Sequence, residues 1–211
     1  MKTTRRQIGA LAAMAALLFA ATGVQAQAAK TPDGLIKEVS TDVLNAVKSD
    51  KTIQAGDVRR VTTLVDQKVL PYVNFQRMTA SAVGRYWRQA TPDQQKRLQD
   101  EFKLLLVRTY SGALSQASSE QTVELKPMRS SPTDNEVVVR TEIRGKGDPI
   151  QLDYRLEKAG DSWKIYDVNV LGVWLVENYR NSFAEEIGAN GIEGLIAKMA
   201  ERNKAANSAK S

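Results

Sequence analysis

Apolar residues recur at helical spacing in six stretches of the chain. The first begins with Thr31 as N-cap and Pro32 at the first helical position, and its apolar residues run from Leu35 to Val47. The same spacing predicts helices over residues 58–69, 75–86, 92–117, 176–187 and 192–199. We expect Gly188 to end the fifth helix, since glycine is favoured just after a helix.

Between the fourth and fifth helices the pattern changes to strict alternation of apolar and polar residues. Alternation predicts strands over residues 123–125, 136–143, 150–157 and 163–170. The apolar phase slips between Ile165 and Val168, which indicates a β-bulge near Tyr166–Asp167. The fold class is therefore α+β: a curved four-stranded antiparallel sheet covered by about six helices. Six helices exceed what one small sheet face needs. Either some helices pack on one another, or helices and sheet enclose an apolar cavity.

The N-terminus has the pattern of a secretory signal peptide. Residues 2–6 are basic, residues 8–24 are almost wholly apolar, and Val24–Ala26 carries small residues where a signal peptidase reads. We expect cleavage after Ala26 and export to a bacterial periplasm, by the Sec or the twin-arginine route; the alternative is a membrane anchor. Residues 27–203 then form a single domain, and residues 204–211 a disordered tail.

Composition removes several classes of chemistry. The 211 residues include no Cys and no His, so disulfides, Cys/His zinc sites and a Ser-His-Asp triad are excluded. The net charge of +6 falls to +3 without the leader, because Lys2, Arg5 and Arg6 lie in it. That balance does not favour a nucleic-acid partner. We predict no catalytic residue and no metal ligand, and hence no enzyme.

Three residues remain open to a functional interpretation in the sheet. Asp167 lies at the expected bulge, where a strand often re-aims a side chain. Tyr154 and Tyr166 could donate protons, as in small cup-shaped isomerases. The simpler interpretation is a hydrogen-bonded bulge residue and two core aromatics with satisfied hydroxyls.

Basic residues gather weakly in the third and fourth helices. Arg77, Arg85 and Arg88 lie in the third, and Lys96, Arg97 and Arg108 in the fourth. They could face an anionic head group or an acidic partner, or form a solvated helix surface. The third helix is also rich in Met and aromatic residues, which is typical of a core and equally of the rim around a flexible apolar ligand.

Several segments together resemble one known family. They are Val69–Val73, Val83–Pro92 with Gln95, Phe102–Ala113, Pro149–Tyr154, Trp163–Val168, Gly172–Val173, Tyr179–Arg180 with Phe183, Gly191–Ile192 and Leu195–Ile196. These segments resemble the MlaC family, also called the toluene-tolerance auxiliary family, which is the periplasmic phospholipid-binding component of the Mla lipid-transport system. The resemblance extends from about residue 35 to 200. Two positions depart from the family pattern: Asn74, often an acid, and Trp174, where a small residue is expected.

The resemblance implies a carrier with no cofactor of its own, whose cargo is a phospholipid. The acyl tails lie in an apolar cavity between sheet and helices. The implied partners are an outer-membrane lipoprotein complex and an inner-membrane ABC transporter with an MCE-type subunit. Burying about sixteen methylenes provides about 13 kcal/mol, enough for affinity without tight head-group contacts.

The expected lipid-binding residues are apolar positions on the inward sheet face and on the helices above it. Ordinary core packing is the alternative for each of them. Two other functions stay open: a cup-shaped isomerase or hydrolase, and a periplasmic adaptor that binds only proteins. The predicted lining residues are Phe75, Met78, Phe102, Leu106, Tyr110, Val137, Val139, Leu152, Tyr154, Trp163, Val173 and Trp174.

Overall fold

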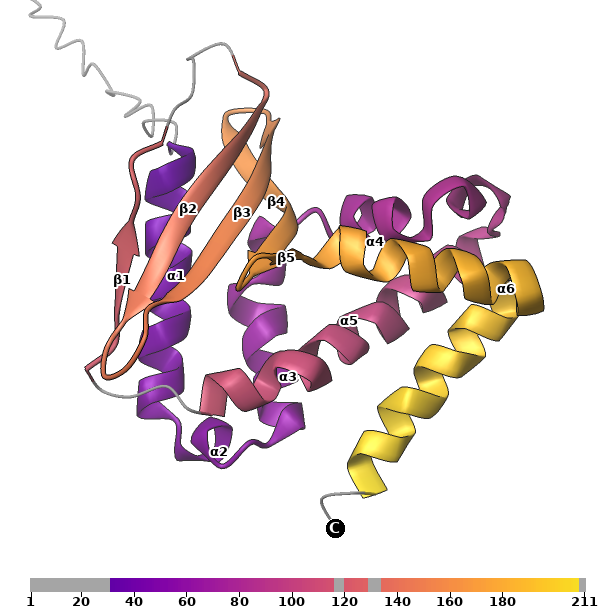
Figure 1. Cartoon of the computed structure of the whole chain (residues 1–211), viewed down its shortest axis with the longest axis horizontal. Helices are drawn as coiled ribbons and strands as arrows, with labels where there is room; N and C mark the ends of the chain where they lie inside the picture. The colour runs from indigo at the N-terminus through magenta and orange to yellow at the C-terminus, as the bar shows by residue number, and fades with distance from the viewer. Residues whose placement is uncertain (1–30, 116–119, 129–133, 209–211) are drawn as a thin grey trace, which may run out of the picture.

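Helices and strands are segregated along the chain, which gives the expected α+β architecture (Figure 1). The computed structural model describes residues 31–115, 120–128 and 134–208, so the leader expected over residues 1–26 lies outside the described residues. No helix within those ranges is long and apolar enough to cross a membrane. The elements are α1 (Pro32–Ser49), α2 (Lys51–Gln54), α3 (Val58–Lys68), the 3₁₀ helix η1 (Leu70–Tyr72), α4 (Phe75–Val83), the 3₁₀ helix η2 (Gly84–Gln89), α5 (Pro92–Ser115), β1 (Thr122–Leu125), β2 (Glu136–Arg144), β3 (Ile150–Ala159), β4 (Ser162–Val170), β5 (Val173–Trp174) and α6 (Leu175–Ser208).

The sheet is a curved, open antiparallel meander in the order β1-β2-β3-β4-β5. The prediction of four strands missed β5, which pairs Val173 with Val170 and Trp174 with Asn169. A two-residue strand is too short to show alternation, so the sequence carries no periodic signal for it.

The bulge predicted in β4 is confirmed. Arg155 pairs with Asp167 and Leu156 with Ile165, so Tyr166 is the extra residue with no partner in β3. The insertion lets Ile165 and Val168 both contact the core next to α1. This explains the slip in apolar phase along the sequence.

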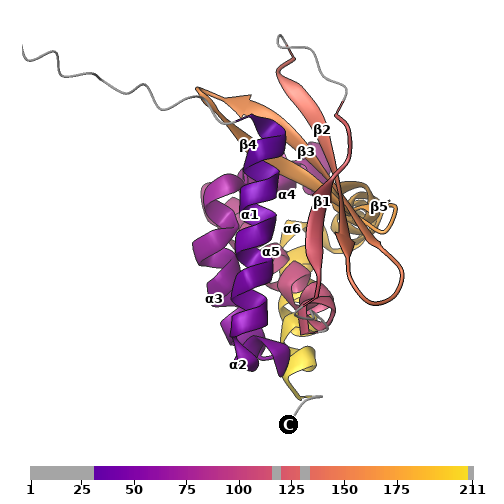
Figure 2. The same cartoon turned by 90° about the vertical axis from the view of Figure 1, so that its left-hand side faces the viewer.

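The described residues form three apolar cores. The smallest joins α1, α2, α3 and α5 through Val47, Ile53, Val61, Leu64 and Val107. The other two contain predicted lining residues. In the first of these two, α1 packs on β2, β3 and β4 through residues that include Leu35, Val139 and Leu156, each with no exposed surface. Figure 2 shows α1 lying along the sheet. In the second, α4, α5 and α6 pack on one another around the fully buried Phe102. Helices thus cover the sheet and also pack together.

The two cores meet at the segment that precedes α4. Val73 and Val168 are partly buried and contact both cores. Val73 forms a parallel bridge with Ile165, and the backbone N–H of Asn74 donates to the carbonyl of Ile165 at 2.8 Å. We call the boundary at Val73 and Val168 the seam.

The C-terminal helix differs from the prediction in two respects. The bend in α6, visible in Figure 1, lies at Gly191 rather than Gly188, because Gly191 adopts φ 70°, a conformation that favours glycine. The expected disordered tail from 204 is also wrong for residues 204–208, which continue α6. Asn203 is buried and its amide donates to the backbone carbonyl and carboxylate of Glu101, which holds this end of the helix.

Candidate functional site

Most residues predicted to contact lipid fall into the two cores on either side of the seam. Four of those on the sheet join the core under α1, and four of those on α4 and α5 join the second core. The first group is Val137, Val139, Tyr154 and Trp163; the second is Phe75, Met78, Phe102 and Leu106. The structure therefore places both groups on the helical side of the sheet, with the seam between them.

An aromatic cluster centres on Phe102. Its ring lies 6.0 Å from Phe75, 5.1 Å from Tyr179 and 5.2 Å from Phe183, measured between ring centroids. The last two contacts are edge-to-face, the arrangement that aromatic quadrupoles favour. Tyr179 and Phe183 were not among the predicted lining residues, although both lie on the apolar stripe of the fifth predicted helix.

Large side chains near the seam keep part of their surface exposed. Phe75, Leu106 and Tyr154 are only half-buried, whereas Phe102 beside them is fully buried. The Tyr154 hydroxyl lies 3.4 Å from the Ser40 hydroxyl of α1, and burial raises the pKa of the Tyr154 phenol. Burial also raises the pKa of Tyr110, which is half-buried on α5. Partly exposed large side chains thus remain next to the two cores.

Two predicted residues lie apart from this group. Trp174 pairs with Asn169 and therefore lies on the sheet face opposite Val168. There its ring stacks under the guanidinium of Arg155, with Cζ 3.9 Å from the ring centroid. Val173, the second of the two, is 46% exposed.

Leu152, by contrast, lies on the predicted side of the sheet. It is half-buried and shares the helix-facing side of β3 with Tyr154.

Asp167 is held by its surroundings rather than directed into an open site. Its Oδ1 accepts hydrogen bonds from the backbone N–H groups of Val168 at 2.9 Å and Val176 at 3.1 Å. Its Oδ2 accepts from Arg155 at 3.0 Å. Desolvation raises the pKa of this buried carboxyl, and the three hydrogen bonds oppose that rise. The geometry favours the interpretation of Asp167 as a hydrogen-bonded bulge residue.

A polar network joins α4 to the sheet. Arg77 pairs with Glu136 at 2.6 Å and also with Glu157, and its guanidinium lies 3.7 Å above the ring of Tyr166. The Tyr166 hydroxyl donates to Glu136 at 2.9 Å. Arg77, followed by Tyr166, lowers the pKa of Glu136. Both tyrosines considered as proton donors thus have hydroxyl partners.

The hydrogen bonds of Asn74 explain why an amide stands at this position, where the family often has an acid. Its Oδ1 caps α4 by accepting from the backbone N–H of Arg77 at 3.0 Å, and its Nδ2 donates to Glu157 at 2.7 Å. An aspartate could make the cap but could not donate to Glu157.

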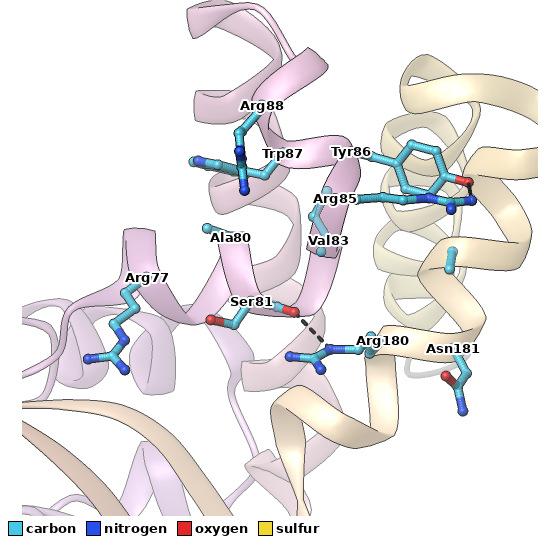
Figure 3. Close-up of a pocket in the computed structure, with 12 residues that line it drawn as sticks. Arg77, Ala80, Ser81, Val83, Arg85, Tyr86, Trp87, Arg88, Arg180 and Asn181 are labelled. Carbon is cyan, nitrogen blue, oxygen red and sulfur yellow. Dashed lines mark hydrogen bonds between the residues drawn. The ribbon is translucent and has the colours of Figure 1, made fainter. Parts of the chain in front are cut away.

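Two hollows on the described part of the chain lie mostly outside the predicted lipid site. One, of about 640 Å³, lies between α4, η2 and α6 and is lined by four arginines (Figure 3). Another, of about 570 Å³, lies on the sheet near Glu136, Val138, Arg140 and Tyr166, and includes Val137 from the predicted set. The described residues contain no cluster of three carboxylates that could hold a metal ion.

The architecture defines a class: α+β proteins in which helices from both ends of the chain cover one side of an open antiparallel meander. A phospholipid-binding protein from Ralstonia solanacearum, solved in complex with a phospholipid, has this fold. The similarity has a TM-score of 0.79 and 44% sequence identity, and covers 83% of this chain and 98% of that chain.

The family follows from the sequence match. The profile of the MlaC protein family matches residues 37–201, and the chain belongs to that family. It is 26% identical over 198 residues to the toluene tolerance protein ttg2D of Pseudomonas putida, covering 90% of this chain and 92% of the relative. It is 24% identical over 173 residues to the intermembrane phospholipid transport system binding protein MlaC of Haemophilus influenzae, covering 80% of each. The resemblance drawn from the sequence is confirmed.

Proposed function

We propose that the protein is a periplasmic phospholipid carrier. The observation that carries this proposal is the likeness to the Ralstonia solanacearum protein, because 44% identity over nearly all of that chain accompanies a bound phospholipid in its structure. The Pseudomonas and Haemophilus relatives, named for toluene tolerance and for intermembrane phospholipid transport, support the same function.

We place the acyl tails at the seam between the two cores. Val73 and Val168 contact both cores. Of the half-buried residues, Tyr154 pairs with Val168, Phe75 follows Val73 by two residues, and Leu106 packs against the second core. A tail that separates the cores there would replace their mutual contacts with contacts to hydrocarbon. Burial of about sixteen methylenes provides about 13 kcal/mol, which can offset the contacts that are lost. The lining then comprises most of the residues predicted from the sequence, without Trp174.

The cargo moves, in this proposal, between an outer-membrane lipoprotein complex and an inner-membrane MCE-type ABC transporter. A carrier needs no covalent chemistry, because it only shields the tails from water. The alternative of an isomerase or hydrolase needs an acid free to exchange protons, and Asp167 instead caps a helix and pairs with Arg155. The adaptor alternative remains an outcome of the test below.

The test is to express the chain with its own leader and purify it from the periplasm. Native mass spectrometry and organic extraction then measure bound phospholipid. We expect about one phospholipid per chain and an N-terminus at residue 27. Delipidated protein should also take up lipid from vesicles. Ligand-free protein that fails to take up lipid would overturn the carrier and favour the adaptor.

A further inference from the structure

The arginine-lined hollow is built from segments far apart in the chain. Residues of α4 from Arg77 to Val83 and of η2 from Gly84 to Arg88 form one wall, and residues 180–184 of α6 form the other. Gly84 ends α4 with φ 66° and turns the chain into η2, so the third predicted helix stops at Val83. This turn places Arg85 and Arg88 on the hollow together with Arg77 and Arg180. We call this surface the arginine hollow.

Positive charge in the arginine hollow is only partly compensated. Arg77 pairs with Glu136 and Glu157, but neither carboxylate lines the hollow. The residues that line it include no Asp or Glu. The remaining three arginines form no ion pair with any carboxylate in the described part of the chain. Arg85 donates to the Tyr86 hydroxyl at 2.9 Å, and Arg180 to the carbonyl of Ser81 at 3.1 Å.

The arrangement of the guanidinium groups indicates what would bind. Figure 3 shows them distributed around the hollow rather than directed at one point. A single phosphate would need a convergent set of donors, whereas a segment with several carboxylates can meet spaced guanidiniums one by one. Trp87 and Tyr86 on the same wall add half-buried aromatic surface, which is common in protein interfaces. A concave surface also fits a protruding segment.

We propose that the arginine hollow is a docking site for an acidic segment of a partner protein. Exposed charge pairs of this kind accelerate association and bind weakly at physiological salt. Such docking is reversible, which suits a protein that visits more than one partner. The inference goes beyond the proposed function and does not require that the chain carries lipid.

The probe is a fluorescein-labelled hexaglutamate peptide, measured by fluorescence anisotropy against the full mature protein. The test variant combines Arg88→Gln and Arg180→Gln. The matched control combines Lys158→Gln and Arg202→Gln, two exposed cations outside the hollow with the same change in charge. At about 20 mM salt we expect the test variant to bind about tenfold more weakly and the control to stay within about twofold of wild type. Binding should fall steeply at about 300 mM salt.

Competition experiments distinguish an acidic peptide from a phosphate or a lipid surface as the ligand of the arginine hollow. Inorganic phosphate and phosphatidylglycerol vesicles are each added to the peptide complex, with phosphatidylcholine vesicles as the neutral control. If phosphate or phosphatidylglycerol binds the hollow in preference to the peptide, the site is a phosphate or lipid-surface site and the proposal is overturned. Equal peptide affinity of the test variant and wild type would overturn it as well.

Two further measurements control for loss of folding and for lipid content. The thermal unfolding midpoint verifies that the test variant is folded. Arg88→Gln alone is the second variant, since the Arg88 side chain makes no hydrogen bond or ion pair with the described residues. With this single variant we expect about threefold weaker binding, and unchanged binding would count against the proposal. Lipid content is measured on the same preparations, so absence of lipid would reject the carrier function separately from the docking site.

Discussion

Asp167 accepts a hydrogen bond from the backbone N–H of Val176 at 3.1 Å, so the bulged strand β4 supplies the cap of the helix that follows it. The same carboxylate accepts from Arg155 of β3 at 3.0 Å. One buried side chain therefore fixes the start of α6 relative to two strands. The second core depends on this placement, because Val176, Tyr179 and Phe183 of α6 all belong to it.

Replacing Asp167 should destabilise the protein in a graded way. Asp167→Asn keeps an oxygen acceptor but loses the charge that pairs with Arg155, and should cost about 1–2 kcal/mol of unfolding free energy. Asp167→Ala leaves two backbone N–H groups without their acceptor and removes one of the two carboxylate partners of Arg155, which keeps Glu177 at 3.0 Å. We expect a cost of about 2–4 kcal/mol. Urea denaturation measures both. The exposed Asp161→Asn is the control and should change stability by less than about 0.5 kcal/mol. An Ala variant as stable as the control would contradict the capping role.

The Arg77–Glu136 pair should make stability depend on pH. Arg77 and Tyr166 lower the pKa of Glu136 below its ordinary value of 4.5. A lowered carboxyl pKa stabilises the fold above about pH 4.5, and that contribution is lost as the pH falls through the folded-state pKa. Glu136→Gln should therefore cost about 0.5–1 kcal/mol at pH 7, a modest figure because Glu136 is largely exposed.

The difference between Glu136→Gln and wild type should start to shrink as the pH falls below about 4.5, and should vanish below the lowered folded-state pKa, where Glu136 is protonated in both the folded and unfolded chain. Chemical denaturation at a series of pH values measures this. The exposed Glu185→Gln serves as control, because Glu185 lies outside the network. A stability difference that stays constant from neutral to acid pH would show that the loss is not electrostatic.

Asn74→Asp should destabilise the join between α4 and β3. Aspartate caps a helix as well as asparagine does, so the cap itself survives. The new carboxylate, however, replaces the Nδ2 donor that lies 2.7 Å from Glu157 and brings two like charges together. We expect a loss of about 1–2 kcal/mol in urea denaturation.

A double-mutant cycle identifies the cause of that loss. Adding Glu157→Gln to Asn74→Asp removes the repulsion, so the cost of Asn74→Asp should be smaller in the Glu157→Gln background than in wild type. If the cost is the same in both backgrounds, the two side chains do not interact as the structure indicates.

Leu171 occupies a backbone conformation that disfavours leucine. Its φ is 51° and that of Gly172 is 90°, the two positive values of the tight turn between β4 and β5. Asparagine tolerates the first position of such turns much better. Since Leu171 is 66% exposed, Leu171→Asn should lose little packing and raise stability by about 0.5–1 kcal/mol. Leu171→Ala is the control. Alanine still carries a Cβ and is therefore strained at positive φ, so its stability should rise very little. If the thermal unfolding midpoint of Leu171→Asn does not rise, Leu171 does not destabilise the turn.

Features of the fold could be predicted from the sequence where they change the periodic pattern of apolar and polar residues. The bulge in β4 was predictable because it shifts the apolar phase by one residue. The bend at Gly191 rather than Gly188 was not, because both are glycines and tertiary packing decides which takes a positive φ. A Cβ at Gly194 would lie 2.3 Å from Cβ of Asn190, so the chain approaches itself closely just after the bend. Such contacts leave no periodic trace.

For the predicted lining residues, the sequence indicated which are buried better than it indicated the sheet face on which each lies. Phe102 and Val139 were expected inside because their helix and strand patterns are strong, and both are fully buried. Trp174 was predicted to line the lipid site. The sequence of a two-residue strand does not show its register with the neighbouring strand, and a shift of one residue would move a side chain to the other face of the sheet. The meeting of Arg180 with Arg85 and Arg88 depends on how α6 folds back, which no local pattern encodes.

Filling the space at the seam should reduce lipid binding. Leu152 is half-buried on the helix-facing side of β3, and Leu152→Trp would add bulk where the acyl tails are proposed to lie. We expect phospholipid uptake from vesicles to weaken about tenfold, equivalent to about 1.4 kcal/mol. Val138→Trp on the opposite face of the neighbouring strand adds bulk outside the seam and should bind lipid as wild type does. Native mass spectrometry of both variants after incubation with vesicles gives the bound fraction. Equal loading of the two variants would place the tails away from β3, even if the protein does carry lipid.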